Sequence, residues 1–369
     1  MSATPPITLP EVAAQLRDEL KKKRFVLLYA HNGTGKTRLS GEFKKIGKRV
    51  DDEGVTVKRD TLYFNAFTED LFNWDNDLEY DQDRRLIMNR DSTFFDGLSS
   101  LEMDVKIGQQ LEHYADFNFY IDYEESYVIF FRERDKENNP IPIKVSRGEE
   151  NIFIWCFFLA ILQIVIDDDE DNPYDWVEYV YIDDPISSLD EHNAVKVAHD
   201  LTDMLAGSRE TLRVVISTHH VLFYNVIANQ FRKKASKLYL TKGDDHETYR
   251  LESLGSVPPF HHLSTLVELS RVQDGAQLNT QHFNMLRRVL EQTAAFFGYE
   301  SWDECLNPKK GETEKAFQKR LLDLSSHGDY LIFQSSMIDD KMRTQFRVIF
   351  EQFRANFPFN NALFSNDDV

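Results

Sequence analysis

Short apolar runs, each followed by small or polar side chains, characterise the first two thirds of the chain. The segments 24–29, 177–182 and 213–218 are largely apolar and lead directly into alanine, aspartate and histidine residues, respectively. Runs of this length between turn-forming and helical stretches are typical of buried strands. The pattern therefore predicts an α/β fold.

The longest apolar run, residues 152–166, leads straight into the acidic stretch DDDEDN. It falls short of the roughly 18 residues expected of a membrane-spanning helix, so no membrane span is predicted. Residues 114–134 nearly alternate between apolar and polar positions, which indicates strands. No sustained heptad pattern is present, so a long coiled coil is not expected.

The pattern becomes helical near the end of the chain. The last expected strands are 236–242 and 247–253, and apolar residues then recur at helical spacing in 279–299, at Phe283, Leu286, Val289, Leu290 and Phe297. The sequence therefore predicts an α/β domain over residues 1–255 and a mostly helical domain over residues 256–369.

Charge and composition narrow the classes of partner. The net charge is −19, which argues against non-specific coating of nucleic acid. From Ser256 onward the chain holds 12 Lys and Arg against 15 Asp and Glu, so a nucleic-acid partner is expected to meet this less acidic part. The N-terminus lacks signal-peptide features, and the two cysteines are far apart, so a reduced cytoplasm is expected.

The first strand leads into a phosphate-binding loop. The stretch YAHNGTGKTRLS fits the P-loop pattern, with Ala30 in place of the first glycine. Glycines let backbone N–H groups approach phosphates, and the helix that follows adds its positive N-terminal dipole. Lys36 is expected to contact the β- and γ-phosphates and Thr37 to ligate Mg²⁺. The residues predicted to bind ATP or GTP here are Asn32, Gly33, Thr34, Gly35, Lys36 and Thr37.

Two later strands end in side chains that suit nucleotide hydrolysis. Asp183 is expected to hold Mg²⁺, directly or through water, and Asp184 to polarise the attacking water. Many ATPases have Glu at the second position, so the role of the shorter Asp184 stays open. His219 matches the switch histidine of ABC-type ATPases, which senses the γ-phosphate; the alternative is a structural histidine.

Two further segments resemble ABC-type motifs that are completed between subunits. Ser146, Gly148 and Glu149 resemble the ABC signature, which binds the γ-phosphate held by the opposite subunit, although a serine before a helix is also an ordinary cap. Asp190, in SSLD, resembles the D-loop at the subunit interface. The predicted assembly is a nucleotide-controlled, head-to-tail dimer, and a higher oligomer stays open.

The helical part offers three groups for RNA cleavage. Arg287 and Glu291 lie four residues apart, and His327 follows in LLDLSSHGDY. The ordinary interpretation is a surface ion pair and a structural histidine. Together, Glu291 would take the proton of an RNA 2′-hydroxyl, His327 would protonate the leaving 5′-oxygen and Arg287 would neutralise the phosphate. This scheme needs no metal and leaves a 2′,3′-cyclic phosphate and a 5′-hydroxyl.

Six stretches spread over nearly the whole chain resemble the PrrC family of bacterial anticodon nucleases: YAHNGTGKTRLS, NAFTEDLFNWDNDL, SRGEENIFIW, YIDDPISSLD, STHHVLFYNV and HFNMLRRVLEQTAAFFGY. The resemblance implies an α/β, ABC-type P-loop ATPase domain joined to a mostly helical C-terminal nuclease domain that cuts a tRNA at its anticodon stem-loop. It places the family's proposed catalytic Arg, Glu and His on Arg287, Glu291 and His327.

The resemblance also carries expectations about biology and substrate. It implies a latent toxin, silenced by a type I DNA restriction–modification complex and released when a phage disables that complex, with nucleotide hydrolysis driving activation. A lysine tRNA is the expected substrate. The corresponding recognition stretch, 251–266, matches the family at Phe260, His262 and Leu263. Phe260, His261 and His262 either stack on anticodon bases or pack as a turn.

Two other functions share the P-loop. An ATPase-coupled DNA nuclease or sensor would act on deoxy substrates and would be expected to carry a metal cluster in the C-terminal part. A regulatory ATPase without nuclease activity would use its C-terminal helices only to bind a partner. The ATPase motifs do not distinguish these alternatives from a tRNA nuclease.

Overall fold

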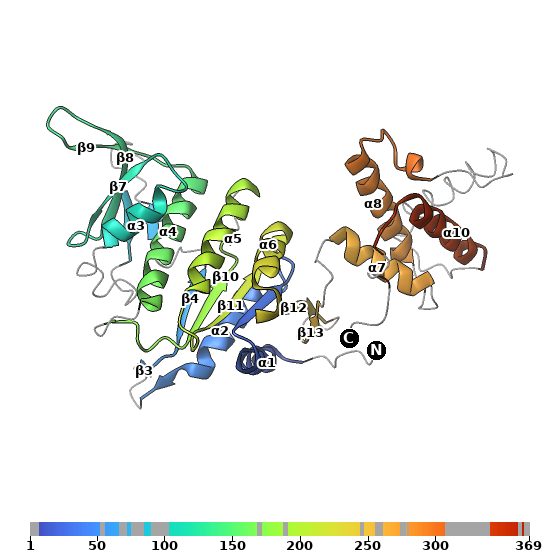
Figure 1. Cartoon of the computed structure of the whole chain (residues 1–369), viewed down its shortest axis with the longest axis horizontal. Coiled ribbons are helices and arrows are strands. Elements are labelled where there is room, and N and C mark those ends of the chain that lie inside the picture. Colours follow the sequence, from blue (N-terminus) through green and yellow to red (C-terminus); the bar gives the residue numbers. More distant parts are fainter. Residues whose placement is uncertain are drawn as a thin grey trace. The chain divides into compact units, whose positions relative to one another are not determined.

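The computed structural model of the chain describes residues 7–51, 56–65, 72–74, 85–89, 103–167, 172–186, 191–243, 247–254, 261–273, 278, 280–306, 340–360 and 364. It divides into two compact units, Met1–Ser253 and Leu254–Val369, and Figure 1 shows the elements of each. The first unit contains strands and helices, whereas the described elements of the second are helical. Each unit is considered by itself.

A six-stranded sheet forms the centre of the first unit. Its order is β13-β12-β1-β11-β10-β4. The strands are β13 (Tyr249–Ser253), β12 (Ala235–Lys242), β1 (Phe25–Tyr29), β11 (Arg213–Thr218), β10 (Tyr179–Asp183) and β4 (Thr61–Asn65). All neighbours are parallel except β12 and β13. The expected strands are therefore confirmed, and β1, β10 and β11 lie side by side.

Helices cover both faces of this sheet, which explains the uninterrupted apolar runs. Val26 and Leu28 pack in one cluster with α1 (Leu9–Lys22) and α2 (Lys36–Gly47). On the other face, Phe25 stacks on Phe231 of α6 with ring centroids 4.0 Å apart. The remaining helices of this region are α5 (Glu191–Ala206), α6 (Val221–Phe231) and the short η3 (Arg232–Lys234).

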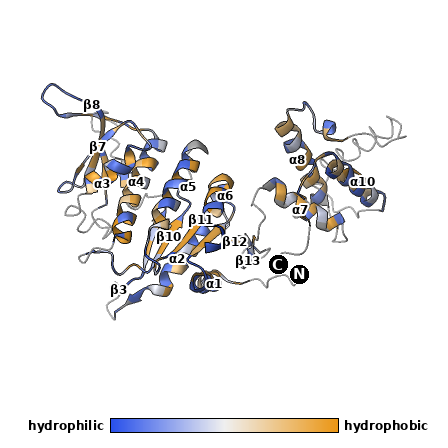
Figure 2. Ribbon diagram, in the orientation of Figure 1, coloured by the Kyte–Doolittle hydropathy of each residue, from blue (hydrophilic) through white to orange (hydrophobic). Residues whose placement is uncertain are grey.

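The apolar helix α4 (Arg147–Ile166) is long and apolar enough to cross a membrane, but 72% of its most apolar window is buried inside the fold. Figure 2 shows its hydrophobic colouring beside α3 (Met103–Leu111). Phe153 packs edge-on against Phe130 and Phe119 of the antiparallel sheet, and Phe157 against Phe72. This helix is thus a core helix of the first unit.

The sheet beside α4 has the order β5-β6-β8-β7, with β9 paired to β8. Its strands are β5 (Phe72–Trp74), β6 (Arg85–Met88), β7 (Asn118–Asp122), β8 (Tyr127–Arg134) and β9 (Pro140–Ile143). The alternation predicted strands over 114–134, and β7 and β8 confirm it. A separate two-stranded ribbon joins β2 (Arg49–Val50) and β3 (Thr56–Lys58).

The second unit has its own apolar core. It is formed by α7 (His261–Gln273), α8 (Thr280–Phe297), the short η4 (Trp302–Cys305) and α10 (Asp340–Asn356). Phe283 of α8 meets Phe346 of α10 edge-on at 5.5 Å. Four of the five apolar residues that predicted α8 are buried in this core, whereas Phe297 is 52% exposed.

Candidate functional site

The loop between β1 and α2 has the backbone that a phosphate-binding loop needs. Gly33 and Gly35 adopt positive φ angles of 79° and 108°, a region that side chains disfavour. Gly35 is also the N-cap of α2, so the first N–H groups of this helix open onto the loop. A Cβ at Gly35 would lie 3.3 Å from the hydroxyl oxygen of buried Tyr249, so the loop is also closely packed.

Lys36 points back into this loop. Its ammonium group donates to the carbonyl oxygens of Ala30 and His31, at 3.2 and 3.4 Å, and to Asn32 Oδ1 at 3.4 Å. It also lies 3.1 Å from Asp184 Oδ2, and its side chain is only 7% exposed. The loop backbone and the carboxylate of Asp184 thus hold the charged group of Lys36 against the loop, which fits the phosphate contact predicted for this lysine.

Asp183 ends β10 beside the start of α2. The hydroxyl of Thr37 donates to its Oδ2 at 2.8 Å, and that of Ser217 donates to its Oδ1 at 2.6 Å. Burial raises the pKa of Asp183 more than these two bonds lower it. A buried carboxylate next to a hydroxyl is a hard-oxygen pair that suits Mg²⁺, whose charge would offset the burial. Thr37 and Asp183 therefore fit the metal predicted for them.

Asp184 has the opposite electrostatic environment. It adopts a positive φ of 51° directly after β10. His219 contacts it through Nδ1, 2.7 Å from Oδ2, and through its backbone N–H, while Thr218 donates to Oδ1 at 3.1 Å. Burial raises the pKa of Asp184, but His219 and Lys36 outweigh it and the pKa is lowered. The structure thus joins Lys36, Asp184 and His219 in one cluster.

Adjacent carboxylates with opposite pKa shifts are a frequent feature of catalytic sites. Burial raises the pKa of Asp183, so a bound cation would stabilise its ionised form. The lowered pKa of Asp184 keeps this carboxylate ionised next to the imidazole of His219. When Mg²⁺ is bound it supplies Lewis-acid polarisation of phosphate oxygens. Asp184 can orient the imidazole and accept hydrogen bonds at the same edge of the sheet.

Ser217, Thr218 and Tyr249 support this site, and the motif pattern did not identify them. The register places Asp183 opposite Ser217, and β10 and β11 are parallel neighbours. Ser217 and Thr218 carry hydroxyl groups at the end of one expected strand, and two aspartates stand at the end of another. This pair of polar strand ends is the signal in the sequence that could have identified Ser217 and Thr218. Tyr249 comes from β13, an antiparallel edge strand, and no local pattern connects it with Gly35.

The segment resembling the ABC signature forms the N-terminus of α4. Ser146 is the N-cap: its Oγ accepts from the Glu149 N–H at 3.3 Å, and Glu149 Oε2 accepts from the Ser146 N–H at 2.7 Å. Arg132 of β8 donates to Glu149 Oε1 at 2.7 Å. Gly148 lies within this first turn. The capping box expected of a serine before a helix is thus present at the N-terminus of α4. A helix N-terminus with this cap can still contact the phosphate of a bound nucleotide.

In the second unit, Arg287 and Glu291 form an ion pair on α8. Arg287 Nε donates to Glu291 Oε1 at 2.9 Å, with the side chains 31% and 47% exposed. Both side chains flank the buried stripe of α8, so they are within reach of solvent. His327, like Asp190 of the first unit, lies outside the described residues, so the structure brings together only two of the three predicted cleavage groups.

His262 is engaged by α8. Its Nδ1 lies 3.0 Å from Gln292 Oε1, and its Nε2 lies 3.1 Å from Thr293 Oγ1. Both ring nitrogens therefore have partners within the unit, which favours packing over base stacking for this residue. Phe260 lies outside the described residues, and so does the side chain of His261.

Comparison with known proteins identifies the family to which the chain belongs. A family model described as an AAA domain matches residues 102–353. An anticodon nuclease from Escherichia coli is 32% identical over 363 residues, which cover 87% of this chain and 89% of that protein. The chain belongs to the anticodon nuclease family. Together with the AAA domain, membership of this family indicates hydrolase activity. The family predicted from sequence is thereby confirmed.

Other similarities are more distant. An uncharacterized chromosomal-cassette protein from Staphylococcus aureus is 24% identical over 242 residues, which cover 59% of this chain and 34% of that protein. A dimeric ATP-binding cassette bound to ADP and phosphate matches 63% of this chain and 85% of its own, with 13% identity and a TM-score of 0.31. The SMC head domain from Thermotoga maritima matches 62% and 90%, with 10% identity and a TM-score of 0.28.

Proposed function

We propose that this anticodon nuclease homologue is a nucleotide-gated endoribonuclease that cuts a tRNA, with lysine tRNA as the expected substrate, at its anticodon. The observation that carries the proposal is the 32% identity to the Escherichia coli anticodon nuclease over nearly the full length of both chains. The two compact units support a division into an ABC-type ATPase domain, about 1–255, and a nuclease domain, about 256–369.

The proposed cleavage uses the chain's own acid–base groups. Glu291 takes the proton from the 2′-hydroxyl, and the 2′-oxygen forms a new bond to phosphorus. The bond from phosphorus to the 5′-oxygen breaks, and His327 protonates that oxygen. Arg287 neutralises charge on the phosphate oxygens. The products are a 2′,3′-cyclic phosphate and a 5′-hydroxyl, and the scheme needs no metal.

The proposed gate is nucleotide hydrolysis at a dimer interface. The P-loop binds ATP or GTP, Thr37 and Asp183 ligate Mg²⁺, and Asp184 with His219 serves hydrolysis. Ser146, Gly148, Glu149 and Asp190 act on nucleotide held by the opposite subunit, so a head-to-tail dimer forms when nucleotide binds. In the cell, this cytoplasmic nuclease is a phage-defence toxin silenced by a type I restriction–modification complex.

Alanine substitutions on α8 test the nuclease proposal. Arg287→Ala and Glu291→Ala are each expected to reduce tRNA cleavage by a factor on the order of 100 or more. Because an exposed i,i+4 pair contributes only about 0.3–0.5 kcal/mol, the fold should persist. Arg288→Ala, on the next and exposed residue, is the matched control.

The readout is cleavage of purified tRNA, with the 3′-terminal phosphate identified chemically. Cleavage by Arg287→Ala and Glu291→Ala at the rate of the Arg288→Ala control would reject the assignment of this pair. Cleavage of DNA in place of RNA by the unmodified protein would favour the DNA nuclease alternative.

A further inference from the structure

One flank of α10 carries a row of arginines. The neighbouring, apolar side of this helix packs into the core of the second unit through Met342, Phe346, Ile349, Phe350 and Phe353. Arg343, Arg347 and Arg354 are four and seven residues apart, so at 100° per residue they lie within about 40° of one another around the helix axis. They therefore form a single stripe beside the core-facing side.

The first two arginines of this stripe are available to an anion. Arg343 and Arg347 are exposed, and no carboxylate among the described residues lies within ion-pair distance of either. Asp340 and Glu351 also lie on this flank, but the three arginines outnumber them. The net charge of the flank is therefore positive. The stripe lies in the part of the chain from Ser256 onward, where 12 Lys and Arg nearly balance 15 Asp and Glu. Most of the overall charge of −19 therefore lies elsewhere in the chain.

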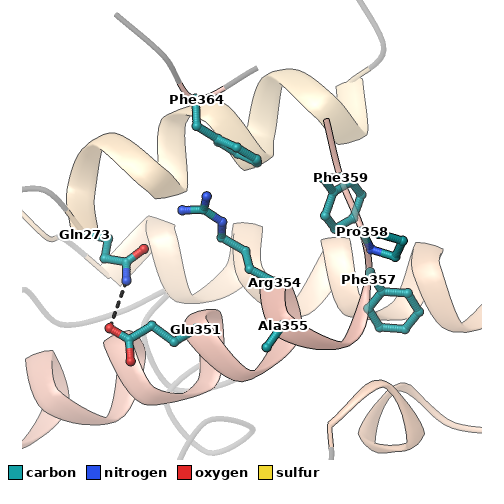
Figure 3. Close-up of a pocket in the computed structure, with 8 residues that line it drawn as sticks. All are labelled: Gln273, Glu351, Arg354, Ala355, Phe357, Pro358, Phe359 and Phe364. Carbon is teal, nitrogen blue, oxygen red and sulfur yellow. Dashed lines mark hydrogen bonds between the residues drawn. The ribbon is translucent and has the colours of Figure 1, made fainter. Parts of the chain in front are cut away.

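A pocket of about 380 Å³ lies at the C-terminal end of the stripe (Figure 3). That volume is within the range of about 300–1,000 Å³ found for small-ligand sites. The Arg354 guanidinium lies 4.0 Å from the centre of the Phe364 ring and donates to Ser270 Oγ at 3.4 Å. The pocket is lined by Gln273, Glu351, Arg354, Ala355, Phe357, Pro358, Phe359 and Phe364.

The polar lining of the pocket includes a buried acceptor that has no donor among the described residues. Gln273 Nε2 donates to Glu351 Oε1 at 3.0 Å, and a carboxylate only accepts, so the amide oxygen must point the other way. Figure 3 shows that oxygen directed toward the Arg354 side. Gln273 Oε1 is buried and has no hydrogen-bond partner among the described residues. A buried acceptor of this kind is costly unless a donor binds it.

We infer that this flank of α10 and its pocket bind single-stranded RNA, with phosphates on the arginine stripe and a nucleobase carrying an exocyclic amino group in the pocket. The inference deepens the proposed function, on which it rests, by assigning a second contact region for the tRNA beyond Arg287 and Glu291. The amino group donates to Gln273 Oε1, and the base face packs on the phenylalanine rings.

The dimensions agree with a nucleic-acid strand. Four helical residues rise about 6 Å and seven rise about 10.5 Å. The three arginines thus span about 16.5 Å along the helix axis, which is long enough to contact more than one phosphate of a single strand. An acidic peptide would match the arginines, but it would leave the ring-lined pocket and the Gln273 acceptor unused.

The test is fluorescence anisotropy with the full chain carrying Arg287→Ala, so that binding is measured without cleavage. The probes are labelled eight-nucleotide RNAs of adenosine, cytidine or uridine, titrated between 50 and 200 mM salt, with poly-glutamate as competitor. We expect the adenosine and cytidine probes to bind about fivefold more tightly than the uridine probe, the effect of one hydrogen bond. Gln273→Leu should remove this preference.

The double variant Arg343→Gln, Arg347→Gln should weaken binding of all three probes and lower the salt slope by about 1.4, or about 0.7 for each phosphate that an arginine no longer neutralises. Lys341→Gln, on the opposite side of the same helix, is the control and should bind like the parent. Both arginines are exposed, so the double variant should melt like the parent.

An unchanged salt slope in the double variant would overturn the inference, and so would displacement of RNA by poly-glutamate at equal charge concentration. The binding test and the test of tRNA cleavage can fail independently of each other. If the unmodified protein cleaves no tRNA but the binding pattern holds, the proposed function fails and the RNA surface stands. If tRNA is cleaved while the double variant binds like the parent, the surface assignment fails alone.

Discussion

Single residues at the ends of β10 and β11 set the electrostatics of the proposed nucleotide site. Motif spacing placed Asp183, Asp184 and His219 at this edge, and the structure joins Asp184 to His219 and Lys36. What spacing could not supply is the opposite pKa shifts of the two neighbouring aspartates. Burial raises the pKa of Asp183, whereas His219 and Lys36 lower that of Asp184, and only the packed sheet determines both the burial and these contacts.

Asp183→Asn is expected to stabilise the protein while it removes nucleotide hydrolysis. The pKa of Asp183 is raised on folding, so ionising it costs stability once the pH exceeds the ordinary value of 3.8. Without added Mg²⁺, the variant should therefore have a higher Tm than the parent at pH 7.5, and this gain should vanish as the pH falls toward 3.8. Turnover should fall by a factor on the order of 100 or more. A lower Tm at pH 7.5 would show that its two hydrogen bonds already satisfy the carboxylate.

Ser146 caps α4 and is proposed to contact nucleotide as well, and one pair of substitutions separates these two roles. Ser146→Ala removes the cap of α4 and should cost about 1 kcal/mol in urea denaturation. Ser146→Asp keeps a good cap but places a carboxylate where the γ-phosphate of the opposite subunit is proposed to bind. The Asp variant should keep the stability of the parent and lose cooperative nucleotide hydrolysis. Full hydrolysis by this variant would leave Ser146 as a cap alone.

At the scale of elements, a buried ion pair holds α1, α2 and β4 together. Arg17 donates to both carboxylate oxygens of Asp60, at 2.7 and 3.0 Å, and to the Phe43 carbonyl oxygen at 3.0 Å. Its guanidinium also lies 4.2 Å from the centre of the Tyr179 ring. The sequence predicted the helix α2 but not the strand β4, and no pattern within either element identifies this long-range pair.

Gly47→Ala should break that contact. A Cβ at residue 47 would lie 1.8 Å from Asp60 Oδ1, so the carboxylate must move away from Arg17. Breaking a buried ion pair costs about 3–5 kcal/mol, and a loss on the order of 3 kcal/mol is expected in urea denaturation. Gly41→Ala, on the same helix with no atom within 4 Å, should be neutral or stabilising by about 0.5–1 kcal/mol. Equal effects of the two substitutions would contradict this account.

At the scale of the whole molecule, apolar patterns predicted β1, β10, β11, β12 and β13 and the helix α8, because buried strands and amphipathic helices have distinct periods. The order of the strands was not predictable, since it depends on pairings such as β1 with β11, almost two hundred residues later. The pairing of Arg287 and Glu291 followed from helical spacing, whereas the arginine stripe of α10 and its pocket emerged only once α7 and the segment after α10 were placed.

The central claim is that nucleotide controls a tRNA-cutting unit in the same chain. The most direct measurement incubates the purified protein with total bacterial RNA, with and without ATP or GTP and Mg²⁺, and sequences the new 5′-hydroxyl ends. The account predicts one sharp end within a single anticodon loop, dependent on nucleotide and absent with His327→Ala. Intact tRNA under every nucleotide condition, while the protein turns over nucleotide, would contradict it.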